Sequence, residues 1–82
     1  MPPKLDPRTR RAALEIGTRL RDARLDAKLS QEFLATRVGM TRGNYARIEA
    51  GLTNVTLETL LRIADGLGMK LTFDVIPKRS RG

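Results

Sequence analysis

Apolar residues recur at steps of three and four positions over most of the chain, which is the spacing of helices that bury one face. Capping residues and glycines divide this pattern into segments, because a Ser or Thr side chain accepts a free amide of a helix's first turn and glycine tolerates the left-handed conformation that ends a helix. The predicted helices are Arg10 to Ala27, Gln31 to Val38 after Ser30, Arg42 to about Ala50 after Thr41, and a fourth that begins after Thr56 and ends near Gly66 to Gly68.

The period changes near the C-terminus. Leu71, Phe73 and Val75 alternate with polar residues until Pro77, a pattern typical of a half-buried strand. No second strand is predicted in the chain, and an unpaired strand leaves its backbone amides and carbonyls without partners. The least costly partner is the same segment of another copy, antiparallel across a two-fold axis. We therefore predict a homodimer in which these apolar side chains also pack onto the fourth helices.

Four regions follow from these patterns. Residues 1–9 contain three prolines and predict a flexible basic arm. Residues 10–69 form the helical domain, 70–77 the dimerisation strand, and 78–82 a short basic tail.

The composition argues against catalysis and against a metal or cofactor site. The 82 residues suffice for one domain with a small core. The chain has no cysteine and no histidine, which removes thiolate chemistry, the commonest general base and the commonest neutral metal ligand. We expect neither an enzyme nor a metal or cofactor site. No apolar stretch approaches the roughly 20 residues that cross a bilayer, and the N-terminus leads into charge, so we predict a cytoplasmic protein without a membrane partner.

The charge indicates a partner. Sixteen Lys and Arg against nine Asp and Glu give a net charge of +7, and twelve of the cations are arginine. The planar guanidinium pairs with phosphate or with a guanine edge better than a lysine ammonium does. This excess favours a nucleic-acid partner, and the alternative is a surface that only keeps the protein soluble and monomeric.

The twenty residues from Gln31 to Ala50 have the pattern of a helix-turn-helix unit. Two helices that cross near a right angle need a small residue at their closest approach, here Ala35, and a turn residue that tolerates positive φ, here Gly39. The apolar positions that hold the second helix on the first are Leu34, Val38, Met40, Tyr45 and Ile48.

Four runs resemble the Cro/C1 repressor family, also called the XRE family: Leu29-Ser30-Gln31-Glu32, Gly39-Met40-Thr41, Ile48-Glu49-Ala50-Gly51 and Leu57 to Ala64. The resemblance covers about Ile16 to Gly68. Leu67 to Phe73 is similar to HigA-type and HipB-type antitoxins, in which a terminal strand follows the last helix. The resemblance implies a mainly α, lambda-repressor-like bundle of four to five short helices, with the C-terminal strand paired across a homodimer.

A DNA-binding role assigns specific residues to the contact. The helix from Arg42 would enter the major groove with its N-terminal side chains at base edges. We predict Arg42 and Arg47 as guanine readers, with Thr41 and Asn44 on the same side to reach a base or a phosphate. The family's use of the equivalent position implies that Gln31 holds a phosphate at its helix N-terminus. The alternative for each is an ordinary exposed polar residue.

Further positions carry weaker expectations. Gly43 stands where members of the family often carry a long base-reading side chain, so that contact is either missing or replaced by a close approach of the backbone, and we predict Gly43 as a DNA-backbone contact. Arg10 and Arg11 either meet phosphate or solvate the first helix. Glu49 would repel phosphate, so we interpret it as a structural residue that pairs with an arginine of the first helix. Tyr45 replaces a usual aliphatic residue, and its buried hydroxyl would need a partner.

The leading hypothesis is a homodimeric transcriptional repressor that binds double-stranded DNA at an inverted repeat, with an autoregulating antitoxin as one form of it. A restriction-modification controller protein is an alternative, although the terminal strand argues against it. A third hypothesis is a protein-interaction antitoxin whose main role is to neutralise a cognate toxin.

Overall fold

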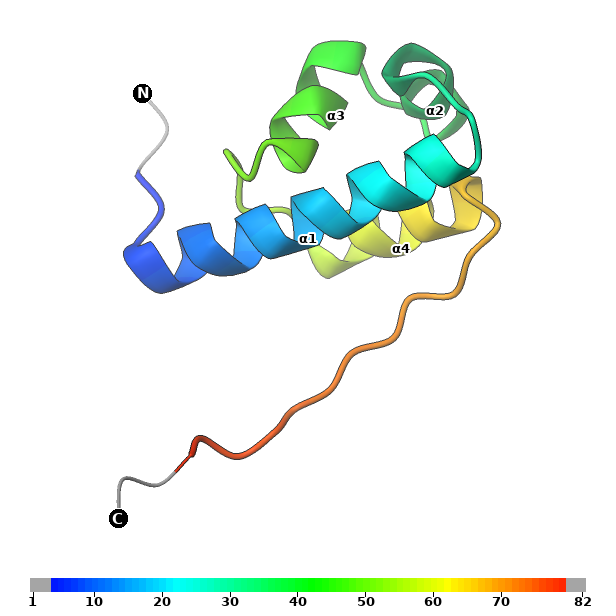
Figure 1. Ribbon diagram of the computed structural model, residues 1–82. Coiled ribbons are helices and arrows are strands. Elements are labelled where there is room, and N and C mark those ends of the chain that lie inside the picture. Colours follow the sequence, from blue (N-terminus) through cyan, green and yellow to red (C-terminus); the bar gives the residue numbers. More distant parts are fainter. Residues whose placement is uncertain (1–3, 80–82) are drawn as a thin grey trace.

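The computed structural model describes residues 4–79, which form four helices and no strand. The helices are α1 (Pro7–Asp26), α2 (Gln31–Arg37), α3 (Arg42–Glu49) and α4 (Leu57–Gly66). In Figure 1 the long α1 crosses the front of the molecule with α4 behind it, and α2 and α3 lie next to each other above them. The mainly α architecture predicted from the sequence is confirmed.

Three helices begin at the predicted caps. The hydroxyls of Ser30, Thr41 and Thr56 each accept the backbone amide three residues further on, at 3.0, 3.1 and 3.1 Å. Each bond satisfies one of the free amides that a helix start leaves. The short α2 and α3 are therefore fixed locally at the residues where they begin.

The first helix begins three residues earlier than predicted. Asp6 caps it by accepting the amide of Thr9 at 2.9 Å, and Pro7 takes the first helical position, where no amide is needed. The predicted flexible arm is therefore wrong for residues 7–9. Residues 1–3 of that arm and residues 80–82 of the predicted basic tail lie outside the described residues.

The turn between α2 and α3 has the predicted glycine conformation. Gly39 has a φ of 78°. Its amide donates to the carbonyl of Thr36 at 3.2 Å, and the amide of Met40 donates to the carbonyl of Ala35 at 2.9 Å. This pair of bonds ends α2 and directs the chain into α3.

The core lies where the helices meet. Leu34 of α2, Tyr45 of α3 and Ile63 of α4 are its largest fully buried side chains. The remaining buried members of this cluster are Leu20, Ala35, Val38 and Ile48, with Ile16, Leu29, Met40, Val55, Leu60 and Leu67 packed around them. Because α2 and α3 both contribute to this core, their relative orientation is fixed by packing as well as by the turn.

Gly17 allows α1 to pass directly against α3. A Cβ at this position would collide with the backbone carbonyl oxygens of Ile48 and Glu49. Backbone oxygens cannot move aside as the end of a flexible side chain can. The backbone at the end of α3 therefore packs directly against the backbone of α1 at Gly17.

The C-terminal segment leaves the helices as an extended chain. In Figure 1 the chain beyond α4 turns back and runs below α1, and residues 69–79 have no regular secondary structure. A strand is defined by its pairing, and this single chain supplies no partner within residues 4–79. The predicted strand and its pairing across a homodimer therefore stay a prediction. None of the described helices is long and apolar enough to cross a membrane.

We predict that Gly17→Ala lowers the free energy of unfolding by about 1–3 kcal/mol, because the added methyl group overpacks the contact between α1 and α3. Urea unfolding followed by circular dichroism measures the change. Gly43→Ala is the matched control, because a Cβ at Gly43 meets nothing within 4 Å. It should stabilise the protein by about 0.5–1 kcal/mol, since alanine favours the helix. Equal unfolding midpoints for the two variants would contradict the close approach.

Candidate nucleic-acid interface

The outer face of α3 carries the predicted base readers. Tyr45 and Ile48 point into the core, whereas Arg42, Asn44 and Arg47 are exposed. The two salt bridges formed among residues 4–79 involve other arginines, so neither Arg42 nor Arg47 is paired with a carboxylate there. Two arginines without intramolecular ion pairs on one short helix are available for an anionic or guanine partner.

Thr41 keeps a donor for a ligand. Its hydroxyl oxygen accepts the backbone amide of Asn44 as the cap of α3. A hydroxyl has one proton to donate besides its lone pairs, so Thr41 can cap the helix and still donate to a phosphate or a base acceptor.

Residues around Arg47 extend the candidate interface beyond those predicted from the sequence. Arg47 lines a depression with Thr53 and Asn54 of the loop after α3 and with Lys4, Asp6 and Thr9 near the chain start. No role was predicted for this loop from the sequence. The signal that the sequence offered was the pair of polar residues, Thr53 and Asn54, shortly after α3.

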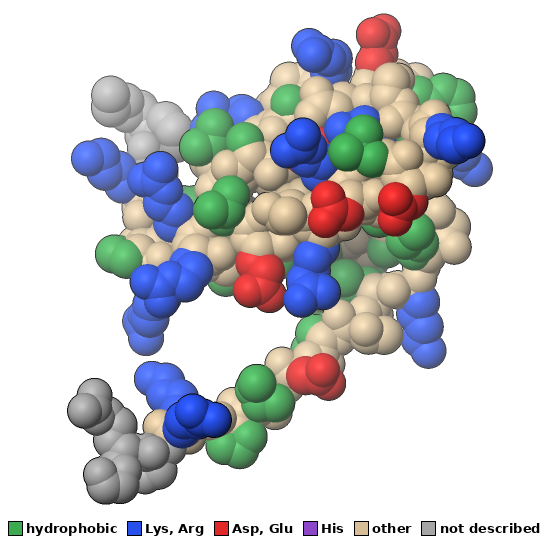
Figure 2. All heavy atoms as spheres, viewed as in Figure 1, with side chains coloured by type: hydrophobic (Ala, Val, Ile, Leu, Met, Phe, Trp, Pro, Cys, Tyr) green, Lys and Arg blue, Asp and Glu red, His purple; other side chains and the backbone are tan. Residues whose placement is uncertain are grey.

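The predicted backbone contacts lie at separate places. Gly43 is exposed at the start of α3 with open space around it. Arg10 and Arg11 are exposed in the first half of α1. Figure 2 shows several Lys and Arg side chains around the end of the molecule where α1 begins. This positive end adjoins the loop after α3 through the depression at Arg47.

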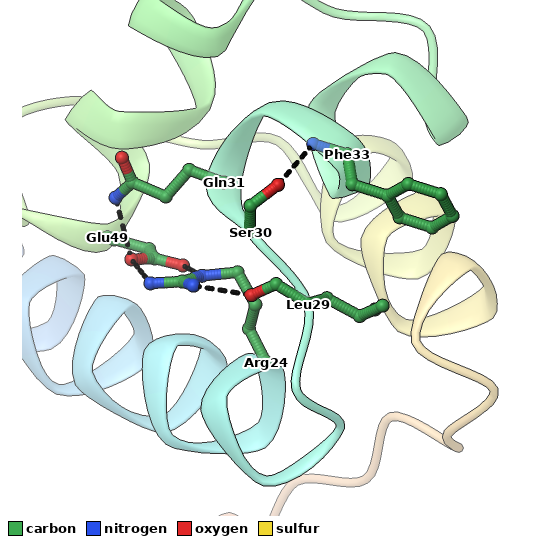
Figure 3. Close-up of polar contacts among 6 residues, drawn as sticks. All are labelled: Arg24, Leu29, Ser30, Gln31, Phe33 and Glu49. Atoms are coloured by element: carbon green, nitrogen blue, oxygen red, sulfur yellow. Dashed lines mark hydrogen bonds and ion pairs between the residues drawn. The ribbon is translucent and has the colours of Figure 1, made fainter.

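A buried ion pair joins α1 to the end of α3. Arg24 Nε donates to Glu49 Oε2 at 2.7 Å, and a second guanidinium nitrogen of Arg24 donates to Glu49 Oε1 at 3.2 Å. The third nitrogen donates to the carbonyl of Leu29 at 2.7 Å, just before α2 (Figure 3). The side chains are 9 % and 4 % exposed, so this fork-shaped pairing is shielded from water. The interpretation of Glu49 as the partner of an arginine in the first helix is confirmed.

Gln31 belongs to the same network. Its Nε2 donates to Glu49 Oε1 at 3.0 Å, and in Figure 3 its amide oxygen points away from the carboxylate. A carboxylate accepts hydrogen bonds only, so the charge of Glu49 fixes which end of the amide faces inward. A phosphate contact from the Gln31 side chain would have to use the second hydrogen on Nε2.

The network stabilises the charged form of Glu49. Burial alone would raise the pKa of this carboxyl, but the hydrogen bonds from Arg24 and Gln31 outweigh burial and lower the pKa below its ordinary value. The partnership with Glu49 likewise raises the pKa of Arg24. Both groups therefore carry their full charges near neutral pH.

Tyr45 lies fully buried beside this pair. Its hydroxyl makes no hydrogen bond to any group among residues 4–79. Burial, followed by the nearby Glu49 carboxylate, raises the pKa of the Tyr45 hydroxyl above its ordinary value. The partner that the sequence analysis required for this hydroxyl is thus not found within the described chain, although the Glu49 carboxylate lies close by.

The fold and this face define a helix-turn-helix DNA-binding protein, with α2 as the supporting helix and α3 as the exposed one. The chain belongs to the helix-turn-helix family, whose model matches residues 20–73. The structure is similar to the restriction-modification controller protein C.AhdI from Aeromonas hydrophila, with a TM-score of 0.72 and 34 % identity over 74 % of this chain and 88 % of that one. A comparison with curated proteins gave no significant match. The resemblance to the Cro/C1 type is confirmed, and the protein is a DNA-binding transcriptional regulator.

We predict that Glu49→Gln lowers the free energy of unfolding by about 3 kcal/mol at pH 7, because Arg24 is left buried without its counter-charge. The folded pKa of Glu49 is lowered, so its contribution is complete above the ordinary carboxyl pKa. That contribution is lost as the pH falls through the folded value, and the gap between wild type and variant should close over that range. Urea titrations from pH 7 to pH 3 measure this gap.

Glu15→Gln is the control for this substitution. Glu15 forms an exposed pair with Arg19 at 3.7 Å, with side chains 71 % and 80 % exposed. Its loss should change stability by less than about 0.5 kcal/mol. A pH-independent gap for Glu49→Gln would show that the ionised carboxylate is not what stabilises the fold.

Proposed function

We propose that the protein acts as a homodimeric repressor that binds an inverted-repeat operator through α3. The observation that carries this proposal is the pair of exposed arginines, Arg42 and Arg47, on a short helix whose other face is locked in the core. A helix supported in this way can enter the major groove without rearrangement. Each arginine can form two hydrogen bonds to the acceptors of one guanine.

The remaining contacts set register on the DNA. Thr41 donates through its free hydroxyl proton, and Asn44 reaches a base or a phosphate beside it. Gly43 lets the DNA backbone come close to the start of α3, and Arg10 and Arg11 neutralise phosphates beyond the groove. Gln31 donates its second amide hydrogen to a phosphate. Such contacts strengthen binding and its salt dependence but add little sequence information.

Dimerisation supplies the specificity that one module lacks. A single helix reads too few base pairs to select one genomic site, whereas two helices about 34 Å apart read two half-sites. The C-terminal segment is the proposed dimer contact, through Leu71, Phe73 and Val75. Two of these side chains, Phe73 and Val75, are 75 % and 91 % exposed in the single chain. A regulator without a further domain can repress by occupying a promoter.

The structural similarity supports a second candidate, a controller of a restriction-modification system. The similar protein is described as a restriction-modification controller, and the match covers most of that chain. The predicted terminal strand argued against this candidate in the sequence analysis, but residues 69–79 form no strand in the single chain. The antitoxin hypotheses, with a toxin as protein partner, rest on the sequence resemblance alone.

We predict that selection from a random DNA pool yields an inverted repeat with half-sites near one helical turn apart. Arg42→Ala and Arg47→Ala should each lose preference at particular base pairs by about 1–3 kcal/mol, because each removes one bidentate base contact. Binding is measured at near-physiological salt on single-base variants of the selected site.

Arg62→Ala is the matched control, because Arg62 is an equally charged, exposed residue on α4. It should leave the base preference unchanged. If no motif emerges and all three variants weaken binding alike, the positive charge provides only nonspecific attraction and the proposed readers are wrong.

We predict that a chain truncated after Gly68 loses dimerisation but keeps its helical circular dichroism spectrum, because all four helices end before that residue. Sedimentation equilibrium of both chains measures the dimer dissociation constant. A truncated chain that dimerises as tightly as the full one would place the interface on the helices.

A further inference from the structure

The backbone amides and carbonyls of the segment from Lys70 to Ile76 are unpaired within residues 4–79. No backbone hydrogen bond within residues 4–79 involves a residue beyond Met69. Ile76 is 79 % exposed, and Phe73 and Val75 are exposed to a similar or greater degree. Free backbone groups beside exposed apolar side chains are the properties of a strand edge that pairs with another chain.

Apolar side chains of the helices lie next to this segment. Leu71 and Phe73 line one groove, of about 710 Å³, with Leu20 of α1 and with Leu57 and Leu60 of α4. Leu57 is itself 57 % exposed. One strand alone leaves the groove open, whereas a second strand beside it would widen the apolar cover over the same helices.

We propose that a second copy of this chain covers the segment in one register, antiparallel and with the two-fold axis at Thr72. Lys70 then lies opposite the partner's Asp74, Leu71 lies opposite the partner's Phe73, and Thr72 meets the partner's Thr72. The inference rests on the homodimer proposed above, and it adds which residues of the two strands lie opposite one another.

Charge complementarity favours this register over the registers next to it. Lys70, Thr72 and Asp74 lie on one face of the strand, and with the axis at Thr72 both charged residues face an opposite charge. On the other face, aromatic and aliphatic side chains oppose one another. Moving the axis to Phe73 places Lys70 opposite the partner's Ile76 and leaves both charges without a counterpart.

Cysteine cross-linking distinguishes the two registers, and the chain contains no cysteine that would interfere. Directly opposed residues have Cα atoms about 4.5–5.5 Å apart, which a disulfide spans, whereas diagonal neighbours at about 7–8 Å are too far apart. Under mild oxidation, Thr72→Cys should form a covalent dimer and Phe73→Cys should not. Cross-linking of Phe73→Cys in place of Thr72→Cys would overturn the register.

Charge exchange provides a second readout that does not depend on oxidation. Lys70→Asp and Asp74→Lys should each weaken self-association at least about tenfold, because both pairs of the dimer become like-charged. Mixing the two variants should restore association as a heterodimer, measured by sedimentation or by native mass spectrometry. Unchanged self-association of both variants would overturn the register.

The same measurements separate the register from the dimer itself. A dimeric wild type that shows neither the Thr72→Cys cross-link nor charge exchange contradicts only the register. A wild type that stays monomeric, free and on operator DNA, contradicts the dimer of the proposed function as well. Each variant should keep its helical circular dichroism, because the substituted positions lie beyond α4.

Discussion

The buried pair of Arg24 and Glu49 is the interaction on which the DNA-facing part of this structure depends. It connects the last turn of α1, the carbonyl of Leu29 in the loop before α2, and the end of α3. Two ions removed from water contribute little net stability compared with apolar residues of similar size, but losing one partner is costly. The pair therefore acts mainly as a constraint on geometry. It holds three chain segments in the single arrangement that satisfies all of its hydrogen bonds.

That constraint reaches the proposed DNA-binding surface in two ways. Glu49 ends α3, so anchoring it fixes the helix that carries Arg42 and Arg47. Glu49 also accepts a hydrogen bond from the side-chain amide of Gln31, so this side chain at the start of α2 is already oriented in the free protein. Groups that are ordered in the free protein lose less conformational freedom on binding. Helices of seven and eight residues would not persist alone, and here the core and the ion pair hold them in place.

The sequence predicted the parts of this structure that local chemistry determines. Ser30, Thr41 and Thr56 each carry their own cap, so the starts of α2, α3 and α4 were predictable. The start of α1 was missed because Pro7 was interpreted as part of an arm, although proline after a capping aspartate is itself a start signal. The pairing of Glu49 with an arginine of the first helix was predicted, but spacing could not identify Arg24 as the buried one, since charged residues normally mark an exposed face. The pairing of residues 70–77 is a property of two chains, and one chain does not contain it.

The open space around Gly43 affects how this protein can change over evolutionary time. Most substitutions that alter binding also reduce stability, and a protein near its stability threshold accepts few of them. Position 43 departs from this rule, because a Cβ added there meets no protein atom within 4 Å. Larger side chains can therefore be introduced at this exposed position without damage to the core. In the proposed complex, where the start of α3 faces DNA, such changes would alter the contacts to the operator while the fold is preserved.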